Sequence, residues 1–152
     1  MFITKLKELG IAFRFKKKSH IVINVLPKPK QSVKTFVTGG RAIHYQPADV
    51  RNYVKLLQMV IKARITEKIT GVPCYVIIFA FFPFNSTDKK PALNRGWAFH
   101  WKKPDCDNIS KPILDALDGL AIDNDSNFAG ITVFKFKAPK PRLEIFIYEL
   151  NY

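Results

Sequence analysis

The apolar stretch over residues 74–82 limits the possible folds more than any other part of the chain. Its nine residues are all apolar and are followed by Pro83. A membrane-spanning helix needs about 20 such residues. A shorter continuous apolar run, bounded by Gly71 and two prolines, is typical of a strand buried on both faces. We therefore expect this strand in the centre of a sheet, and we expect no association with a membrane.

Periodic apolar residues predict the other elements around that strand. The pattern predicts strands over residues 20–27, 97–101, 129–137 and 142–150, with the last two forming a hairpin around 139–141. A long helix is expected over 47–68, with Asp49 as its cap, and a second helix from Asp107 or Asn108 to Gly119. Residues 26–45 are expected to form a loop or a loose hairpin around Gly39 and Gly40, and 84–96 a polar loop. This order favours an α+β fold, a mixed β-sheet of about four to five strands with two principal helices.

Length and composition indicate one domain. The chain has 152 residues, of which 47% are apolar, and 13 phenylalanines give the core bulk. We expect a basic extension over residues 1–19, for which no pattern assigns a structure, followed by the domain over 20–152. The two cysteines, Cys74 and Cys106, form neither a disulfide framework nor a zinc pattern. With no signal-peptide pattern at the start, this predicts a reducing, cytoplasmic environment.

The charge of the chain points to a polyanionic partner. The net charge is +13, and residues 1–48 hold ten basic residues against one acid. Such a balance indicates nucleic acid or an anionic membrane surface, and the lack of a membrane-spanning pattern favours nucleic acid. Four basic residues are interleaved with aromatic residues and glycines in a way that favours phosphate contact over a merely solvated surface. These predicted DNA-binding residues are Lys28, Lys30, Lys34 and Arg41. The basic residues of the helix over 47–68 are either a solvated face or a second phosphate-facing surface.

Half of the twelve acidic residues lie between positions 105 and 125, where Lys111 is the one basic residue. A carboxylate cluster in such a basic protein would repel a polyanion, and a divalent metal ion is the simplest way to neutralise it. Asp105 and Asp107 are two residues apart, so in an extended segment both can approach one ion. Helix capping is the alternative for this pair, although it would use only one of them.

The helix after this pair is expected to bury one face and to present charge on the other. At 100° per residue, Asp107, Lys111, Asp115 and Asp118 lie on one side. Lys111 can therefore pair with Asp115 or stabilise charge at a phosphate. Asp115 and Asp118 are expected to orient Lys111 or to remain solvated. The segment from Asp123 begins like a calcium loop, but its sixth and twelfth positions are phenylalanines, which excludes an EF-hand.

The combined pattern D-x-D-N-x-x-K-x-x-x-D-A-L, followed by N-D-S before an apolar strand, resembles the RusA family of Holliday-junction resolvases. The resemblance is strongest over residues 100–137. It implies a homodimeric, magnesium-dependent endodeoxyribonuclease, active also with manganese, that cuts branched DNA at four-way junctions by paired hydrolysis in recombination and repair. It also implies a bacterial or phage source.

The same resemblance assigns roles to particular residues. It implies metal ligands at Asp105, Asp107 and Asp125, with Lys111 as a further catalytic residue. The family usually has two adjacent acids before the strand, whereas this chain has Asn124 and then Asp125. Asp125 matches the ligand position, and Asp123 is the alternative. Two other functions stay open: a metal-dependent nuclease of broader branched-DNA specificity, and an inactive DNA-binding relative.

Overall fold

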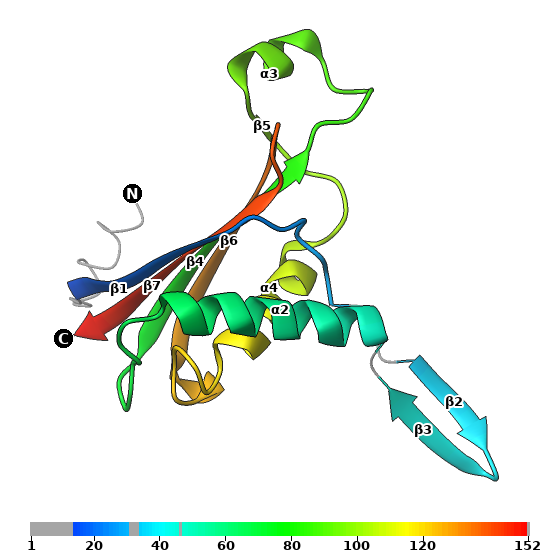
Figure 1. Cartoon of the computed structure of the whole chain (residues 1–152), viewed down its shortest axis with the longest axis vertical. Coiled ribbons are helices and arrows are strands. Elements are labelled where there is room, and N and C mark those ends of the chain that lie inside the picture. The colour runs from blue at the N-terminus through cyan, green and yellow to red at the C-terminus, as the bar shows by residue number, and fades with distance from the viewer. Residues whose placement is uncertain (1–13, 31–33, 46, 152) are drawn as a thin grey trace, which may run out of the picture.

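The computed structural model describes residues 14–30, 34–45 and 47–151, and its centre is a five-stranded sheet (Figure 1). The strands lie in the order β1-β7-β4-β6-β5. Their bounds are Arg14–Ile23 for β1, Cys74–Pro83 for β4, Ala98–Phe99 for β5, Phe128–Ala138 for β6 and Arg142–Asn151 for β7. β4 pairs with β6 in parallel and with β7 antiparallel, so the sheet is mixed. The expected α+β fold is confirmed.

The predicted central position of β4 is confirmed, but the predicted hairpin of the last two strands is wrong. β4 lies between β6 and β7, which therefore do not pair with each other. Alternate residues of β4, such as Val76 and Ile78, are fully buried, and those between them are half-buried. A strand this apolar gains most when both of its edges are also covered by neighbouring strands, and β6 and β7 supply that cover.

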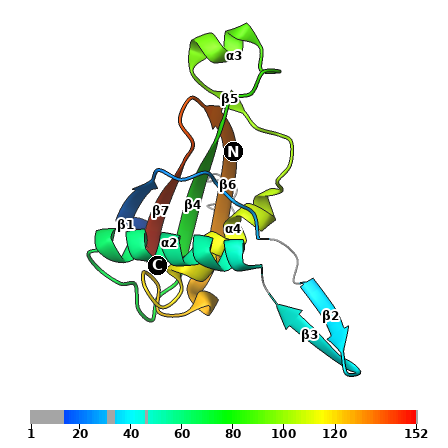
Figure 2. The same cartoon turned by 45° about the vertical axis from the view of Figure 1, so that its right-hand side comes forward.

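Two long helices, α2 (Ala48–Arg64) and α4 (Cys106–Leu117), pack on the same face of the sheet (Figure 2). Leu57 of α2 and Ile113 of α4 are fully buried in one core with residues of the strands. The predicted cap of α2 is wrong, because the capping position is Pro47 and Asp49 lies inside the first turn. The segment 84–96 contains a short helix, α3 (Lys90–Arg95), in place of a plain loop. No helix in the described part of the chain is long and apolar enough to cross a membrane.

β1 starts six residues earlier than the sequence predicts and ends at Ile23. The basic run in its first half pairs with β7, with a bulge between Lys17 and Ser19. At this bulge the ammonium of Lys18 lies 2.8 Å from carboxylate oxygens of both Glu67 and Glu149. These contacts raise the pKa of Lys18 and keep the charge paired although the side chain is nearly buried. The start of the chain over residues 1–13 lies outside the described residues.

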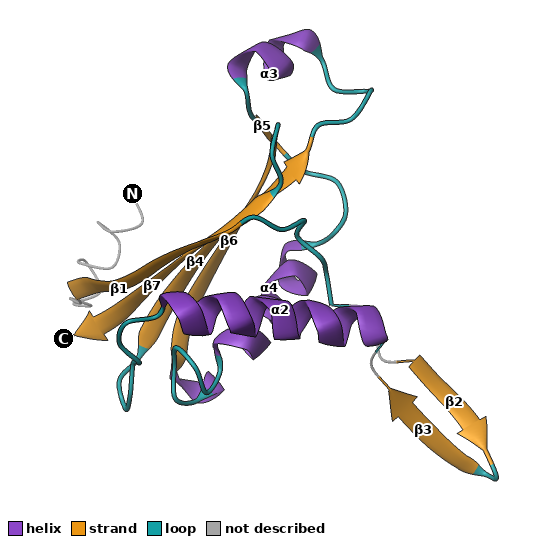
Figure 3. Ribbon diagram, in the orientation of Figure 1, coloured by secondary structure: helices purple, strands orange, loops and turns teal. Residues whose placement is uncertain are grey.

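A two-stranded hairpin projects away from the body beyond the start of α2 (Figure 3). It consists of β2 (Lys34–Thr38) and β3 (Arg41–Tyr45), which pair antiparallel. Gly39 and Gly40 form its turn with φ angles of 54° and 71°. The two-residue type I′ turn, whose twist matches that of the flanking strands, requires a positive φ at both of its central residues. The expected hairpin around Gly39 is confirmed.

The sheet face turned away from α2 and α4 is rich in aromatic side chains. The ring of Phe79 on β4 has its centroid 5.6 Å from that of Phe134 and 5.9 Å from that of Phe136, both on β6. The ring of Phe136 in turn packs against that of Phe99 on β5, with 5.4 Å between the ring centroids. A row of packed rings thus connects the centre of the sheet to the segment that precedes α4.

Candidate functional site

Asp105 and Asp107 stand at the start of α4. Asp105 is the capping residue by position, with extended backbone, but its side chain makes no capping hydrogen bond. Both residues are exposed. The helix begins at Cys106, one or two residues before the predicted start. The amino end of a helix carries a partial positive charge, which favours this pair of acids.

Lys111 lies one helical turn after Asp107 and contacts it directly. Its ammonium is 3.1 Å from a carboxylate oxygen of Asp107 and 3.3 Å from the side-chain oxygen of Asn108. The hydrogen bond from Lys111 holds the pKa of Asp107 below its ordinary value of 3.8. The pairing of Lys111 with Asp115, one of the two predicted alternatives for Lys111, does not form, because Asp115 pairs with Lys30 at 2.8 Å.

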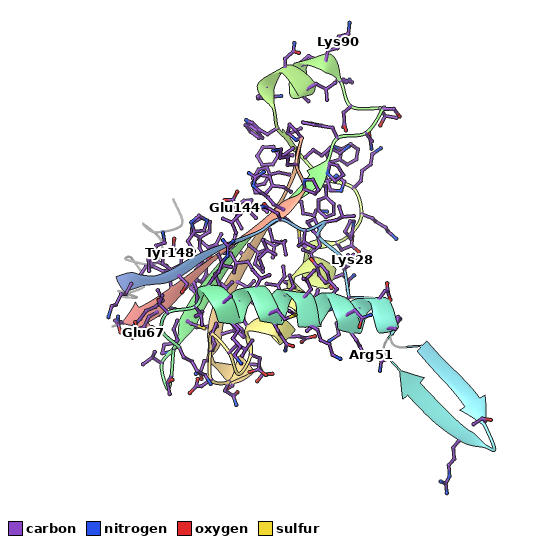
Figure 4. All side chains as sticks on the ribbon, viewed as in Figure 1. Lys28, Arg51, Glu67, Lys90, Glu144 and Tyr148 are labelled. Carbon is purple, nitrogen blue, oxygen red and sulfur yellow. The ribbon has the colours of Figure 1, made fainter. Side chains whose placement is uncertain are left out.

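The segment before residue 31 is fastened across both long helices by its backbone. Pro112 has no N–H group, so the carbonyl of Asn108 in the preceding turn lacks its usual helical donor. The backbone N–H of Lys30 donates to that carbonyl at 2.7 Å. The N–H of Lys28 donates to the hydroxyl of Tyr53 on α2 at 3.2 Å. The backbone therefore holds Lys30 beside α4 and Lys28 beside α2, and Figure 4 shows Lys28 above α2.

The other two predicted DNA-binding residues lie in the projecting hairpin. Lys34 begins β2 and Arg41 begins β3, next to the turn. Arg41 is exposed. The predicted basic surface therefore has two parts, one held against α2 and α4 and one on the projecting hairpin.

Asp125 is not brought to the acidic pair within one chain. It starts the short 3-10 helix η1 (Asp125–Asn127), which follows the far end of α4 and leads into β6. The twelve residues of α4 separate its two ends by about 18 Å. The strand agrees with this separation: the thiol of Cys106 lies 4.0 Å from the carbonyl of Val133, well along β6 from its start. No three acidic, histidine or cysteine side chains among the described residues are grouped closely enough to hold a metal ion.

The two candidate acids of the turn before β6 have different surroundings. Asp123 accepts a hydrogen bond from the backbone N–H of Gly71 at 3.1 Å and another from the side chain of Asn127. It therefore ties this turn to the segment before β4. Asp125 is exposed. This difference favours Asp125 over Asp123 as a residue available to a ligand.

Lys135 is a positioning residue that the sequence interpretation missed. Its ammonium donates to the backbone carbonyls of Lys102 and Pro104, at 2.7 Å each. The backbone N–H of His100 donates to the backbone carbonyl of Lys135 at 2.9 Å. These bonds fix the loop that delivers Asp105. Lys135 alternates with phenylalanines along β6, so it lies on the helix-bearing face rather than among the rings, and that alternation was the available signal.

His100 is held by this loop rather than offered to a metal ion. One ring nitrogen lies 3.2 Å from the carbonyl of Lys103, and the ring packs against Phe82. Burial, followed by the charge of Lys135, lowers the pKa of His100 below 6.5. Both effects favour the neutral form of the ring.

These features define a basic α+β protein that presents acids and lysines together at a helix start, as expected of a protein that acts on phosphate backbones. Residues 23–148 match the family described as endodeoxyribonuclease RusA. The chain belongs to the RusA endodeoxyribonuclease family, which resolves Holliday junctions. It is also similar to the uncharacterized protein YqaN of Bacillus subtilis (strain 168), with 27% identity over 129 residues, covering 82% of this chain and 88% of that protein.

The contact between Lys111 and Asp107 predicts a measurable titration. Replacing Lys111→Met should raise the pKa of Asp107 toward 3.8, because the hydrogen bond from the ammonium is the main cause of its lowering. Any folding stability that this ion pair contributes is fully present when the pH is above the ordinary pKa of Asp107. It is lost as the pH falls through the lowered pKa that Asp107 has in the folded protein. Carboxyl NMR of the metal-free protein measures this pKa. Lys111→Arg should keep it low, and an unchanged pKa in Lys111→Met would contradict the assignment.

Proposed function

We propose that the protein is a magnesium-dependent endodeoxyribonuclease that resolves four-way DNA junctions by paired hydrolysis of phosphodiester bonds, in DNA recombination and repair. The observation that carries this proposal is the exposed Asp105–Asp107 pair at the start of α4, with Lys111 bonded to Asp107. Membership of the RusA family supports it. On the same ground we place the enzyme in the cytoplasm of a bacterium, encoded by the host or by a phage.

The donor chemistry of the pair fits magnesium or manganese. Magnesium takes hard oxygen ligands and usually binds proteins through one or two carboxylates, with water and substrate phosphate filling its other positions. Asp105 and Asp107 are exposed, and Asp105 makes no capping hydrogen bond. They would hold the ion, and when bound it would activate water and stabilise the leaving oxygen.

Lys111 supplies a mobile positive charge at the same point. Its side chain is half exposed, and it reaches Asp107 without being enclosed by other groups. As the phosphate enters, Lys111 would exchange part of its contact with Asp107 for an oxygen of the scissile phosphate. A positive charge at that position stabilises the transition state more than the ground state, because charge on the phosphate oxygens is redistributed as the bond breaks.

The third predicted ligand, Asp125, lies about one helix length from the pair in its own chain. We therefore assign the third carboxylate of each site to Asp125 of the partner subunit in a homodimer. A twofold dimer repeats every contact between copies, so it would complete two matched sites at once. Two such sites are what paired nicks in a near-twofold junction require.

The basic residues would supply affinity rather than cleavage. Lys28 lies beside α2, Lys30 lies beside α4, and Lys34 and Arg41 lie on the projecting hairpin. Lys30 already pairs with Asp115, so part of its charge is neutralised before DNA binds. We expect Lys28 and the hairpin residues to carry most of the phosphate contacts of this set.

Cleavage should depend on the acidic pair and on magnesium. Asp105→Asn should lower the cutting rate on a four-way junction by about 100-fold or more, because even indirect supports of a metal site contribute about 10- to 100-fold. Junction binding should persist, since affinity comes mainly from lysine and arginine contacts. Gel assays with and without magnesium measure both. Asp118→Asn, an exposed acid at the other end of α4, is the matched control and should cut normally.

The substrate panel of this assay separates the competing functions. Four-way, flap and linear DNA are compared under the same conditions. Selective cutting of the four-way junction supports the proposal, and equal cutting of flaps indicates a nuclease of broader branched-DNA specificity. Binding without cutting by the unaltered protein would indicate an inactive relative. An Asp105→Asn variant that folds and still cuts at the normal rate with magnesium would refute the metal-site assignment.

Salt dependence should locate the phosphate contacts. The test changes Lys28, Lys30, Lys34 and Arg41 together to alanine. The slope of log affinity against log salt concentration should become shallower by up to about 3.6, because each phosphate contact contributes about 0.9 to the slope. The control is an equal loss of charge from the exposed side of α2, in the residues Arg51, Lys55, Lys62 and Arg64. Fluorescence anisotropy at several salt concentrations measures the slopes. A larger change in the α2 variant would place the DNA on that helix.

A further inference from the structure

The loop that leads into Asp105 carries large aromatic side chains that the fold leaves in solvent. Trp101 is 83% exposed, Phe99 is 64% exposed and Trp97 is 39% exposed. They are close to the start of α4, since Trp101 precedes Asp105 by four residues. Rings this size normally pack into cores or interfaces. Their exposure beside the candidate cleavage site suggests that they contact a ligand.

Cations accompany these rings. The ammonium of Lys102 lies 5.7 Å from the ring centroid of Trp101, and the guanidinium of Arg95 lies 5.2 Å from that of Trp97. Residues 88–104 hold five basic side chains and one acid. That acid, Asp88, is already paired with Lys137 at 2.7 Å. The surface is therefore aromatic and strongly positive, and a second copy of this chain would bring the same charge against it.

The rings border a hollow rather than a flat surface. Its volume is ≈ 460 Å³, within the range of pockets that enclose small organic groups. The residues that line it include the aromatic Phe99 and Trp101, the basic Lys89, Lys102 and Lys137, His100 and the acid Asp88. Figure 4 shows Lys90 at the outer end of this projecting segment. The hollow thus joins apolar ring surface to cations, which suits a group that is flat and aromatic at one end and anionic at the other.

The rings of Trp97 and Phe99 are held in place, and so is the backbone around Trp101. The ring of Trp97 packs edge-on against Phe99 at 5.5 Å, and Phe99 packs on Phe136 of the sheet. Lys135 and His100 fix the backbone on either side of Trp101 by hydrogen bonds. An aromatic surface that is already ordered binds with a smaller loss of side-chain entropy.

We propose that Trp101, Phe99 and Lys102 form a stacking platform for an unstacked base of branched DNA. A nucleotide has a flat base that stacks on aromatic rings and a phosphate that pairs with lysine, and stacking of this kind tolerates any base. Bases inside a continuous duplex hide their faces, so the platform engages only where stacking is interrupted, as at a branch point. It therefore favours branched DNA over linear duplex and holds the branch a few residues from Asp105. This inference rests on the proposed function for the choice of DNA as partner.

Fluorescence tests the contact without any cleavage. The chain has two tryptophans, so Trp97→Phe leaves Trp101 as the one tryptophan. In metal-free buffer, a four-way junction should quench its emission, and a linear duplex of the same sequence should leave it nearly unchanged. Equal quenching by both DNAs would overturn the proposal.

Affinity measurements on matched variants separate stacking from other roles. Trp101→Leu should weaken junction binding by about fivefold or more, since one base stack contributes at least that much. Trp101→Phe should lose less than about threefold, and linear duplex affinity should not change in either. Leu93→Ala, an exposed apolar residue on α3, is the control and should bind normally. Circular dichroism checks that each variant is folded.

Three results would refute the platform: equal losses in the leucine and phenylalanine variants, an equal loss on duplex DNA, or conversion of a dimer to a monomer by Trp101→Leu. The last would identify a self-association surface. Failure of the proposed function looks different. If the protein binds junctions through Trp101 but never cuts them, the platform stands and the proposed nuclease function is rejected. If the unaltered protein cuts normally and the Trp101→Leu variant binds junctions as tightly as it does, only the platform is rejected.

Discussion

The packing of α4 against the sheet is the constraint on which the candidate site depends. Ile109, Ile113 and Leu117 of this helix are fully buried, and each such side chain contributes about 1.5–3 kcal/mol relative to exposure. This fixes the rotation of the helix, so the acids at its start and Lys111 one turn later must face solvent. The chemistry of the site is thus set by burial on the opposite side of the same helix.

A second constraint joins the basic part of the chain to this helix. Pro112 removes one helical hydrogen bond, and the carbonyl it frees is satisfied by the backbone of Lys30. A proline inside a helix usually costs stability, but here it opens a docking point for the segment that holds Lys28. The charge of Lys30 is therefore kept beside α4 by a main-chain bond, which salt screens far less than contacts between surface charges.

Sequence periodicity predicted the elements that bury an apolar face. It failed where the structure depends on contacts between residues far apart in the sequence. β4, α2 and α4 followed from their patterns, because each fills the core. The six residues of α3 bury no side chain, so no pattern marks them. The insertion of β4 between β6 and β7 depends on edge pairing, which alternation along one strand does not encode. In the site, the adjacency of Asp105, Asp107 and Lys111 was local and predictable. The distance of Asp125 was not, because it depends on the direction that the chain takes after α4.

The central claim is that each metal site takes Asp105 and Asp107 from one copy and Asp125 from the other. Two inactive variants, Asp105→Asn and Asp125→Asn, test it when they are mixed so that subunits exchange. A mixed dimer would then have one site with both changes and one site with none, so an equal mixture should regain about a quarter of the nicking activity of the unaltered protein. If all three aspartates acted within one chain, both sites of a mixed dimer would stay defective. A mixture that remains inactive, although light scattering shows dimers and exchange has been verified, would contradict the account.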